Sequence, residues 1–139
     1  MRDFVCYLAG QMTGISYDES NIWRTTAKEW LESRECNFHV KVTNPNDYYN
    51  FLTKTYIDDK EIIRFDLHKV RISDLILVNL NGFSIGTAME LQHAIDNNVP
   101  ILGYKDDREE LHPWLKYTCD RVFDSLEECL RYVEDYYLN

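Results

Sequence analysis

The sequence predicts an α/β fold in which a parallel sheet is covered by helices on both faces. Apolar runs with strand character alternate along the chain with segments whose apolar residues recur at helical spacing. Residues 74–80 (DLILVNL) form a continuous apolar run, which is typical of a strand buried on both faces. This alternation favours parallel strands joined by right-handed crossovers. The 139 residues suit one domain, residues 1–139.

The first half of the chain predicts two strands and two helices. Residues 4–8 (FVCYL) form an apolar strand that a glycine soon follows, and residues 19–34 carry apolar side chains three and four apart, as in a helix. Residues 38–45 predict a second strand, which Asn-Pro ends. The aromatic segment 48–55 is expected to be a loop. Residues 56–73 place apolar side chains on broad helical faces.

The second half repeats the alternation. After the strand at 74–80, a helix is predicted at about 87–97, and VPILGY predicts a strand at 99–104. A variable acidic segment follows, and then a short fifth strand at 121–124. Residues 125–138 close the chain as a helix whose apolar side chains exceed what one sheet face needs. That excess predicts a homodimer or larger homo-oligomer.

Composition excludes several classes of function. The net charge is −9 and the basic residues are scattered, so we expect no nucleic-acid partner. No apolar run approaches the roughly 20 residues of a membrane span. The apolar run at residues 4–9 is too short for a signal peptide, so we expect none. Four cysteines stand far apart without a C-x-x-C pair, which indicates reduced thiols and a cytoplasmic protein. The four histidines show no metal-ligand spacing, so neither a metal nor a cofactor is predicted.

Ligands of parallel sheets bind outside the carboxyl ends of the strands. Here those ends are residues 10–14, 43–47 and 81–86. A small anionic ligand would have to be held there by backbone N–H groups and hydroxyls, against the unfavourable field of the whole chain. The G-x-x-x-x-G-K-[ST] and G-x-G-x-x-G patterns are absent, so neither a P-loop nor a dinucleotide site is indicated.

The carboxylate of Glu90 has two interpretations. Thr87 and Glu90 fit a capping box at the start of a helix, with Thr87 as the N-cap, and Ser125 and Glu128 repeat the pattern. Alternatively, Glu90 is a catalytic group, which the helix dipole would keep ionised. Asp66, on a mostly apolar helix, is by itself more often a solvated or ion-paired carboxylate than a catalyst.

Four segments in order carry a resemblance to a known family. YLAGQMTG (7–14), Asp66 with SDLILV eight residues on, SIGTAMELQHA (84–94) and VPILGY (99–104) resemble the nucleoside 2-deoxyribosyltransferase-like superfamily. The resemblance implies a flavodoxin-like (Rossmann-like) five-stranded parallel sheet and an oligomer in which residues 117–121 reach a neighbour's site. It also implies that Glu90 attacks the anomeric carbon of the sugar, that Tyr7 holds this carboxylate, and that Asp66 helps the base to leave.

One departure from the family pattern is informative. Deoxyribosyltransferases carry an aspartate six residues before the nucleophile, whereas this chain has Ser84. In having a serine there, the chain resembles the branch of the superfamily that cleaves nucleoside 5′-monophosphates. A hydroxyl at this position can bind a 5′-phosphate, which a carboxylate would repel. Gly86 and the loop residues Gly10, Gln11 and Met12 would complete the substrate site, although that branch often has a serine in place of Gln11.

The resemblance therefore predicts a nucleoside 5′-monophosphate N-glycosidase. Its substrate would be a small-molecule nucleotide, preferably a pyrimidine nucleotide such as CMP, and its products free base and (deoxy)ribose 5-phosphate. Two alternatives stay open at this point. One is a nucleoside 2-deoxyribosyltransferase, which passes the sugar to a second base. The other is a non-catalytic nucleotide-binding or sensor domain.

Overall fold

The computed structural model describes residues 1–48, 58–82 and 84–139, and within these ranges it contains a five-stranded parallel sheet of order β2-β1-β3-β4-β5. This order is that of flavodoxin-like sheets, so the predicted fold class is confirmed. The elements in chain order are β1 (Arg2–Ala9), α1 (Tyr17–Glu32), β2 (Phe38–Thr43), the 3-10 helix η1 (Pro45–Asp47), α2 (Asp59–Arg71), β3 (Leu75–Asn79), α3 (Ile85–Asp96), β4 (Ile101–Tyr104), α4 (Pro113–Thr118), β5 (Arg121–Phe123) and α5 (Leu126–Tyr136).

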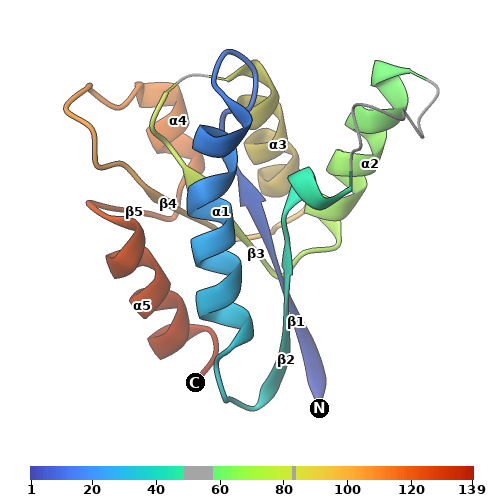
Figure 1. Cartoon of the computed structure of the whole chain (residues 1–139), viewed down its shortest axis with the longest axis vertical. Coiled ribbons are helices and arrows are strands. Elements are labelled where there is room, and N and C mark those ends of the chain that lie inside the picture. Colours follow the sequence, from blue (N-terminus) through green and yellow to red (C-terminus); the bar gives the residue numbers. More distant parts are fainter. Residues whose placement is uncertain (49–57, 83) are drawn as a thin grey trace.

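Helices cover both faces of the sheet (Figure 1). α1 and α5 lie side by side on one face, where they share an apolar core with every second side chain of β1. α2, α3 and α4 cover the other face, where a second core surrounds the remaining side chains of β1 and β3. β1 and β3 are therefore buried on both sides, as the continuous apolar run of β3 predicted.

The start of α3 differs from the prediction. The helix begins at Ile85, and its N-cap is Ser84, whose Oγ accepts a hydrogen bond from the Thr87 N–H at 3.3 Å. The capping box that assigned Thr87 to the N-cap was therefore wrong. Serine and threonine are both good N-caps, so the pattern alone does not separate them. The earlier start buries Thr87, whereas Ser125 caps α5 as predicted.

Two further features near the C-terminus differ from what the sequence suggested. The acidic segment contains the short helix α4, which begins with a proline in its first turn and is too short to show a helical period. The apolar side chains of α5 are not surplus, because Leu130 and Val133 are buried in the core shared with α1. Tyr132 packs against Phe123 at a tilt, with ring centres 5.1 Å apart, and Tyr136 alone remains a large exposed apolar side chain of this helix.

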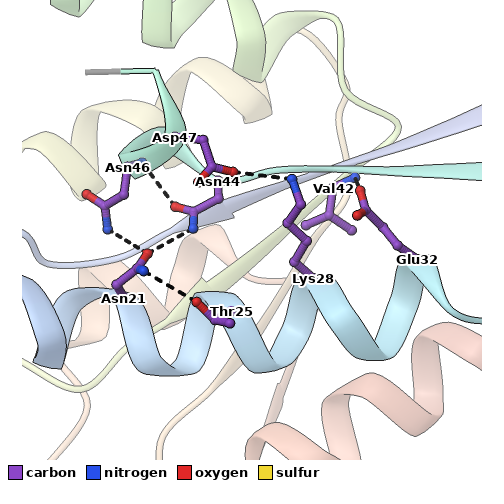
Figure 2. Close-up of polar contacts among 8 residues, drawn as sticks. All are labelled: Asn21, Thr25, Lys28, Glu32, Val42, Asn44, Asn46 and Asp47. Carbon is purple, nitrogen blue, oxygen red and sulfur yellow. Dashed lines mark hydrogen bonds and ion pairs between the residues drawn. The ribbon is translucent and has the colours of Figure 1, made fainter. Parts of the chain in front are cut away.

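The carboxyl end of β2, one of the three predicted ligand positions, is tied to α1 by amide side chains (Figure 2). Asn44, only 2% exposed, donates to Asn21 Oδ1 at 2.9 Å and accepts from the Asn46 N–H at 3.0 Å. Asn46 donates to the same oxygen of Asn21 at 3.1 Å. These amides therefore anchor the loop after β2. Most of the predicted aromatic loop, residues 49–55, lies outside the described residues.

Replacing the central amide tests this anchor. We expect Asn44→Ala to lower the free energy of unfolding by about 1–3 kcal/mol, because it leaves buried polar groups of the loop without partners. Urea denaturation followed by circular dichroism measures the effect. Thr25→Ala, which removes an exposed hydroxyl bonded to Asn21, is the matched control and should stay within about 0.5 kcal/mol of the wild type. Equal losses in both variants would contradict the anchor.

Candidate active site

The core of the candidate site is a hydrogen bond between Tyr7 and Glu90. Tyr7 lies near the carboxyl end of β1 and is 1% exposed. Its hydroxyl donates to Glu90 Oε2 in a short hydrogen bond, although the two residues are 83 positions apart. Glu90 is half-buried at the sixth position of α3. The structure thus brings together two of the three predicted catalytic side chains.

Asp66 is the third predicted group, and it faces the same pair from α2. Its carboxylate is half-buried and interacts electrostatically with both Tyr7 and Glu90. Three different elements therefore supply one phenol and two carboxyl groups to a single position beside the sheet. Such convergence of titratable groups is characteristic of catalytic sites.

The surroundings shift the proton equilibria of this group. Burial raises the pKa of Glu90 to about 8, the Tyr7 hydroxyl lowers it, the charge of Asp66 raises it, and the charge of Arg24 lowers it. Burial and the neighbouring carboxylates hold the pKa of Tyr7 well above its usual value, so Tyr7 stays a neutral donor. The expectation that the helix dipole keeps Glu90 ionised was wrong, since Glu90 lies beyond the first turn, where the dipole acts.

The loop after β1 carries the predicted residues Gly10, Gln11 and Met12. Gly10 is buried, and a Cβ there would lie 2.9 Å from the Trp23 ring, so a larger residue would displace the loop. The Gln11 side chain covers Gly82, where a Cβ would meet Oε1 of Gln11 at 2.1 Å. Gln11 and Met12 are half-buried. The loops that follow β1 and β3 are therefore in contact.

The N-terminus of α3 holds the other predicted substrate-binding residues, Ser84 and Gly86. Gly86 is exposed, and among the described residues its added Cβ would meet one atom, Ser84 Oγ at 3.8 Å. α3 carries no acidic residue in its first turn, in contrast to α1, α2 and α5. Thr87 Oγ1 is buried without a hydrogen-bond partner in the described part of the chain. This helix end thus offers donors without a competing carboxylate.

Sequence analysis missed Arg24 of α1. Its side chain is buried, with 1% exposure, and donates to the carbonyls of Leu8, Gly10 and Ser20. The pKa of Arg24 is lowered to about 10, chiefly by burial, so the guanidinium remains charged at neutral pH. One signal was available, because Arg24 shares the buried face of α1 with Ala27 and Leu31, at helical spacing.

Within the described ranges, no helix is long and apolar enough to cross a membrane, and no three His, Cys, Asp or Glu side chains gather as they would around a metal ion. The four cysteines are free thiols.

The fold and the hydrogen bond between Tyr7 and Glu90 define a flavodoxin-like α/β protein with a candidate active site beside β1. The sequence matches the family described as nucleoside 2-deoxyribosyltransferase over residues 6–133, so the chain belongs to this family of enzymes. The resemblance predicted from the four sequence segments is thereby confirmed. None of the curated proteins matches the chain.

Solved structures give the same fold. A conserved protein from Enterococcus faecalis V583 has a TM-score of 0.73 at 19% identity, with 95% of this chain and 98% of that chain covered. A 2-desoxiribosyltransferase from Leishmania mexicana has a TM-score of 0.69 at 19% identity, with 97% and 99% covered. The CMP N-glycosidase BcmB from Clostridium botulinum has a TM-score of 0.65 at 13% identity, with 95% and 98% covered.

The raised pKa of Glu90 makes stability depend on pH. Between the usual pKa of 4.5 and about 8, the unfolded chain loses the proton that the folded protein keeps, so stability falls as pH rises through this range. Glutamine imitates the protonated group at every pH. We expect Glu90→Gln to gain on the wild type as pH rises, reaching about 1–2 kcal/mol of extra stability near pH 9.

Urea unfolding at pH 5, 7 and 9 measures this difference. Glu29→Gln, which removes an exposed carboxyl group of α1, is the matched control. If the difference in unfolding free energy between Glu90→Gln and the wild type stays constant from pH 5 to 9, ionisation of Glu90 does not destabilise the folded protein and the prediction is wrong.

Proposed function

We propose that the protein is a nucleoside 5′-monophosphate N-glycosidase. The observation that carries the proposal is the hydrogen bond from Tyr7 to Glu90 with Asp66 beside it, because this set supplies a held nucleophile and an acid. A domain that only binds nucleotides gains nothing from a half-buried carboxylate with a raised pKa. Membership of a catalytic family supports the same conclusion.

The reaction proceeds in two displacements. In the reactive form of the site, the proton that the two carboxyl groups share lies on Asp66 and Glu90 is ionised. An oxygen of Glu90 bonds to C1′ of the sugar, the C1′–N bond breaks, and Asp66 gives its proton to the departing base. Water then bonds to C1′ and releases Glu90, and the proton from this water returns to Asp66. The Tyr7 hydroxyl orients the Glu90 carboxylate throughout. The products are free base and (deoxy)ribose 5-phosphate.

The N-terminus of α3 supports recognition of the 5′-phosphate. Ser84 Oγ accepts the capping bond from Thr87, so its O–H remains available to donate to an anion. A glycine inside a helix costs about 1 kcal/mol relative to alanine, and the described chain leaves space for a Cβ at Gly86. Close approach of a ligand would account for this glycine. Gly10, Gln11 and Met12 would face the substrate from the first loop.

The base is proposed to be a pyrimidine, with CMP as the first candidate. One of the similar structures is a CMP N-glycosidase. The alternative chemistry is transfer of the sugar to a second base, and the description of the family supports this alternative. Both activities share the Glu90 intermediate, so they differ in whether water or a base attacks C1′ in the second step.

A substrate panel tests the proposed activity. Ribo- and deoxyribonucleoside 5′-monophosphates are incubated with the wild type, with and without a second free base, and products are separated by chromatography. We expect free pyrimidine base without any acceptor, and no product from Glu90→Gln at the same concentration. Product that forms only when a second base is present would move the assignment to a transferase. Product formation by Glu90→Gln at the wild-type rate would remove Glu90 from the mechanism.

The phosphate preference is tested separately at Ser84. We expect wild-type kcat/KM for a 5′-monophosphate to exceed that for the matching nucleoside at least about tenfold, since one charge-assisted hydrogen bond contributes roughly 1.5–3 kcal/mol. Ser84→Asp should erase most of this preference by raising KM for the nucleotide. Ser125→Asp changes the N-cap of α5 instead and is the matched control. Equal cleavage of nucleoside and nucleotide by the wild type would refute the phosphate site.

We also propose a homodimer or larger assembly that completes the site. Large apolar side chains are exposed on the neighbouring helices α3 and α4: Ile85, Met89, Trp114 and Tyr117. Residues 117–121 adjoin this surface and would reach the neighbour's site. We expect light scattering to give at least twice the chain mass of 16.6 kDa, and Trp114→Glu to lower that mass. A monomeric wild type with full activity would contradict the assembly.

A further inference from the structure

Arg24 is a buried cation without an ion-pair partner among the described residues. Its guanidinium instead donates to backbone carbonyls, including that of Gly10 at 2.9 Å and that of Leu8 at 3.4 Å. The guanidinium carbon lies 4.7 Å from the centre of the Trp23 ring. Burying a charge is costly unless other groups compensate for it. A residue that served only to fill space would not need this charge.

The position of Arg24 is fixed by its neighbours on α1. Its Nη1 donates to the Ser20 carbonyl, and Ser20 Oγ accepts from Asn46 at 3.4 Å. The next residue of α1, Asn21, accepts hydrogen bonds from Asn44 and Asn46 at the end of β2 (Figure 2). The first half of α1 is therefore hydrogen-bonded to the loops after β1 and β2, and Arg24 makes the bond to the loop after β1.

The charge of Arg24 acts on the candidate catalytic groups. Arg24 Nε donates to the carbonyl of Leu8 at 3.4 Å, and Leu8 directly follows Tyr7, whose hydroxyl donates to Glu90 Oε2. Tyr7 and Asp66 also interact with Glu90, and Arg24 is the one cation that does so among the described residues. Tyr104 of β4 also interacts with Arg24. The two carboxyl groups of the site repel each other, so a nearby fixed cation favours their ionised forms.

We propose that Arg24 is a positioning residue with two separable roles: its planar fork fixes the Leu8 and Gly10 carbonyls and hence the first loop, and its charge stabilises the carboxylate of Glu90. The proposal rests on the proposed function in taking Glu90 as the nucleophile. Its electrostatic role is nevertheless measurable without turnover. Lysine keeps the charge but lacks the fork, and methionine lacks both, so two variants separate the roles.

The charge is tested by the titration of Glu90. Proteins labelled with ¹³C at glutamate carboxyl carbons are titrated by NMR, and Glu90→Gln assigns the signal. We expect the Glu90 midpoint to stay near that of the wild type in Arg24→Lys and to rise by about 1 pH unit or more in Arg24→Met. Lys28→Met removes an exposed cation from the same helix and should leave the midpoint unchanged. One midpoint shared by the wild type and Arg24→Met would overturn the electrostatic role.

The fork is tested by kinetics with the substrate found in the panel. We expect Arg24→Lys to raise KM about tenfold with kcat nearly unchanged, because the first loop loses its anchor while Glu90 keeps its charge partner. Arg24→Met should in addition move the acidic limb of the kcat/KM profile to higher pH. An unchanged KM in Arg24→Lys would overturn the loop role.

A measurement on the wild type covers the case in which Arg24→Met fails to fold. The ¹⁵N resonance of Arg24 Nε should shift with the same midpoint as the Glu90 carboxyl carbon, and a resonance that ignores this titration would overturn the electrostatic role. If the NMR results are as expected but the wild type cleaves no nucleotide, the proposed function is wrong and the electrostatic role of Arg24 stands.

Discussion

The hydrogen bond between Tyr7 and Glu90 fixes the geometry of the candidate site. It joins β1, which pairs with β2 and β3, to a helix that begins only after β3. Ser84 caps the start of α3, and Glu90, at the sixth position of this helix, lies on the face that contacts β1. The hydrogen bond thus sets where α3 lies against the sheet.

Holding this carboxylate away from water is costly, and nearby groups offset part of the cost. The Tyr7 hydroxyl and the Arg24 charge favour the ionised form of Glu90, whereas burial and Asp66 oppose it. Burial has the largest effect, and it leaves the proton equilibrium of Glu90 close to neutral pH. In a chain with a net charge of −9, the buried cation Arg24 thus acts on the carboxyl group of the candidate site.

The sequence predicted the five strands, four of the helices and the three side chains that converge. The elements were predicted correctly because apolar residues recur along them at strand or helix spacing. Tyr7, Asp66 and Glu90 were found because they stand in motifs that occur in a recognisable order and spacing. The errors have local causes. α4 is shorter than two helical turns, and the choice between Ser84 and Thr87 as N-cap depends on tertiary contacts. Arg24 was missed although it shares the buried face of α1, because its hydrogen-bond partners are backbone carbonyls, which no sequence pattern identifies.

α3 links the two halves of the site. Ser84 caps this helix, and Glu90 follows six residues later, so the helical rise separates them by about 9 Å along the axis. The backbone between them is rigid, and the group at the helix start therefore faces a fixed part of any sugar whose C1′ lies against Glu90. Under the proposed function, a serine at this position would accept a phosphate group that an aspartate would repel. The same helix would then carry both the phosphate-binding group and the nucleophile, while the chemical step would depend on the contacts of Glu90 with β1 and α2.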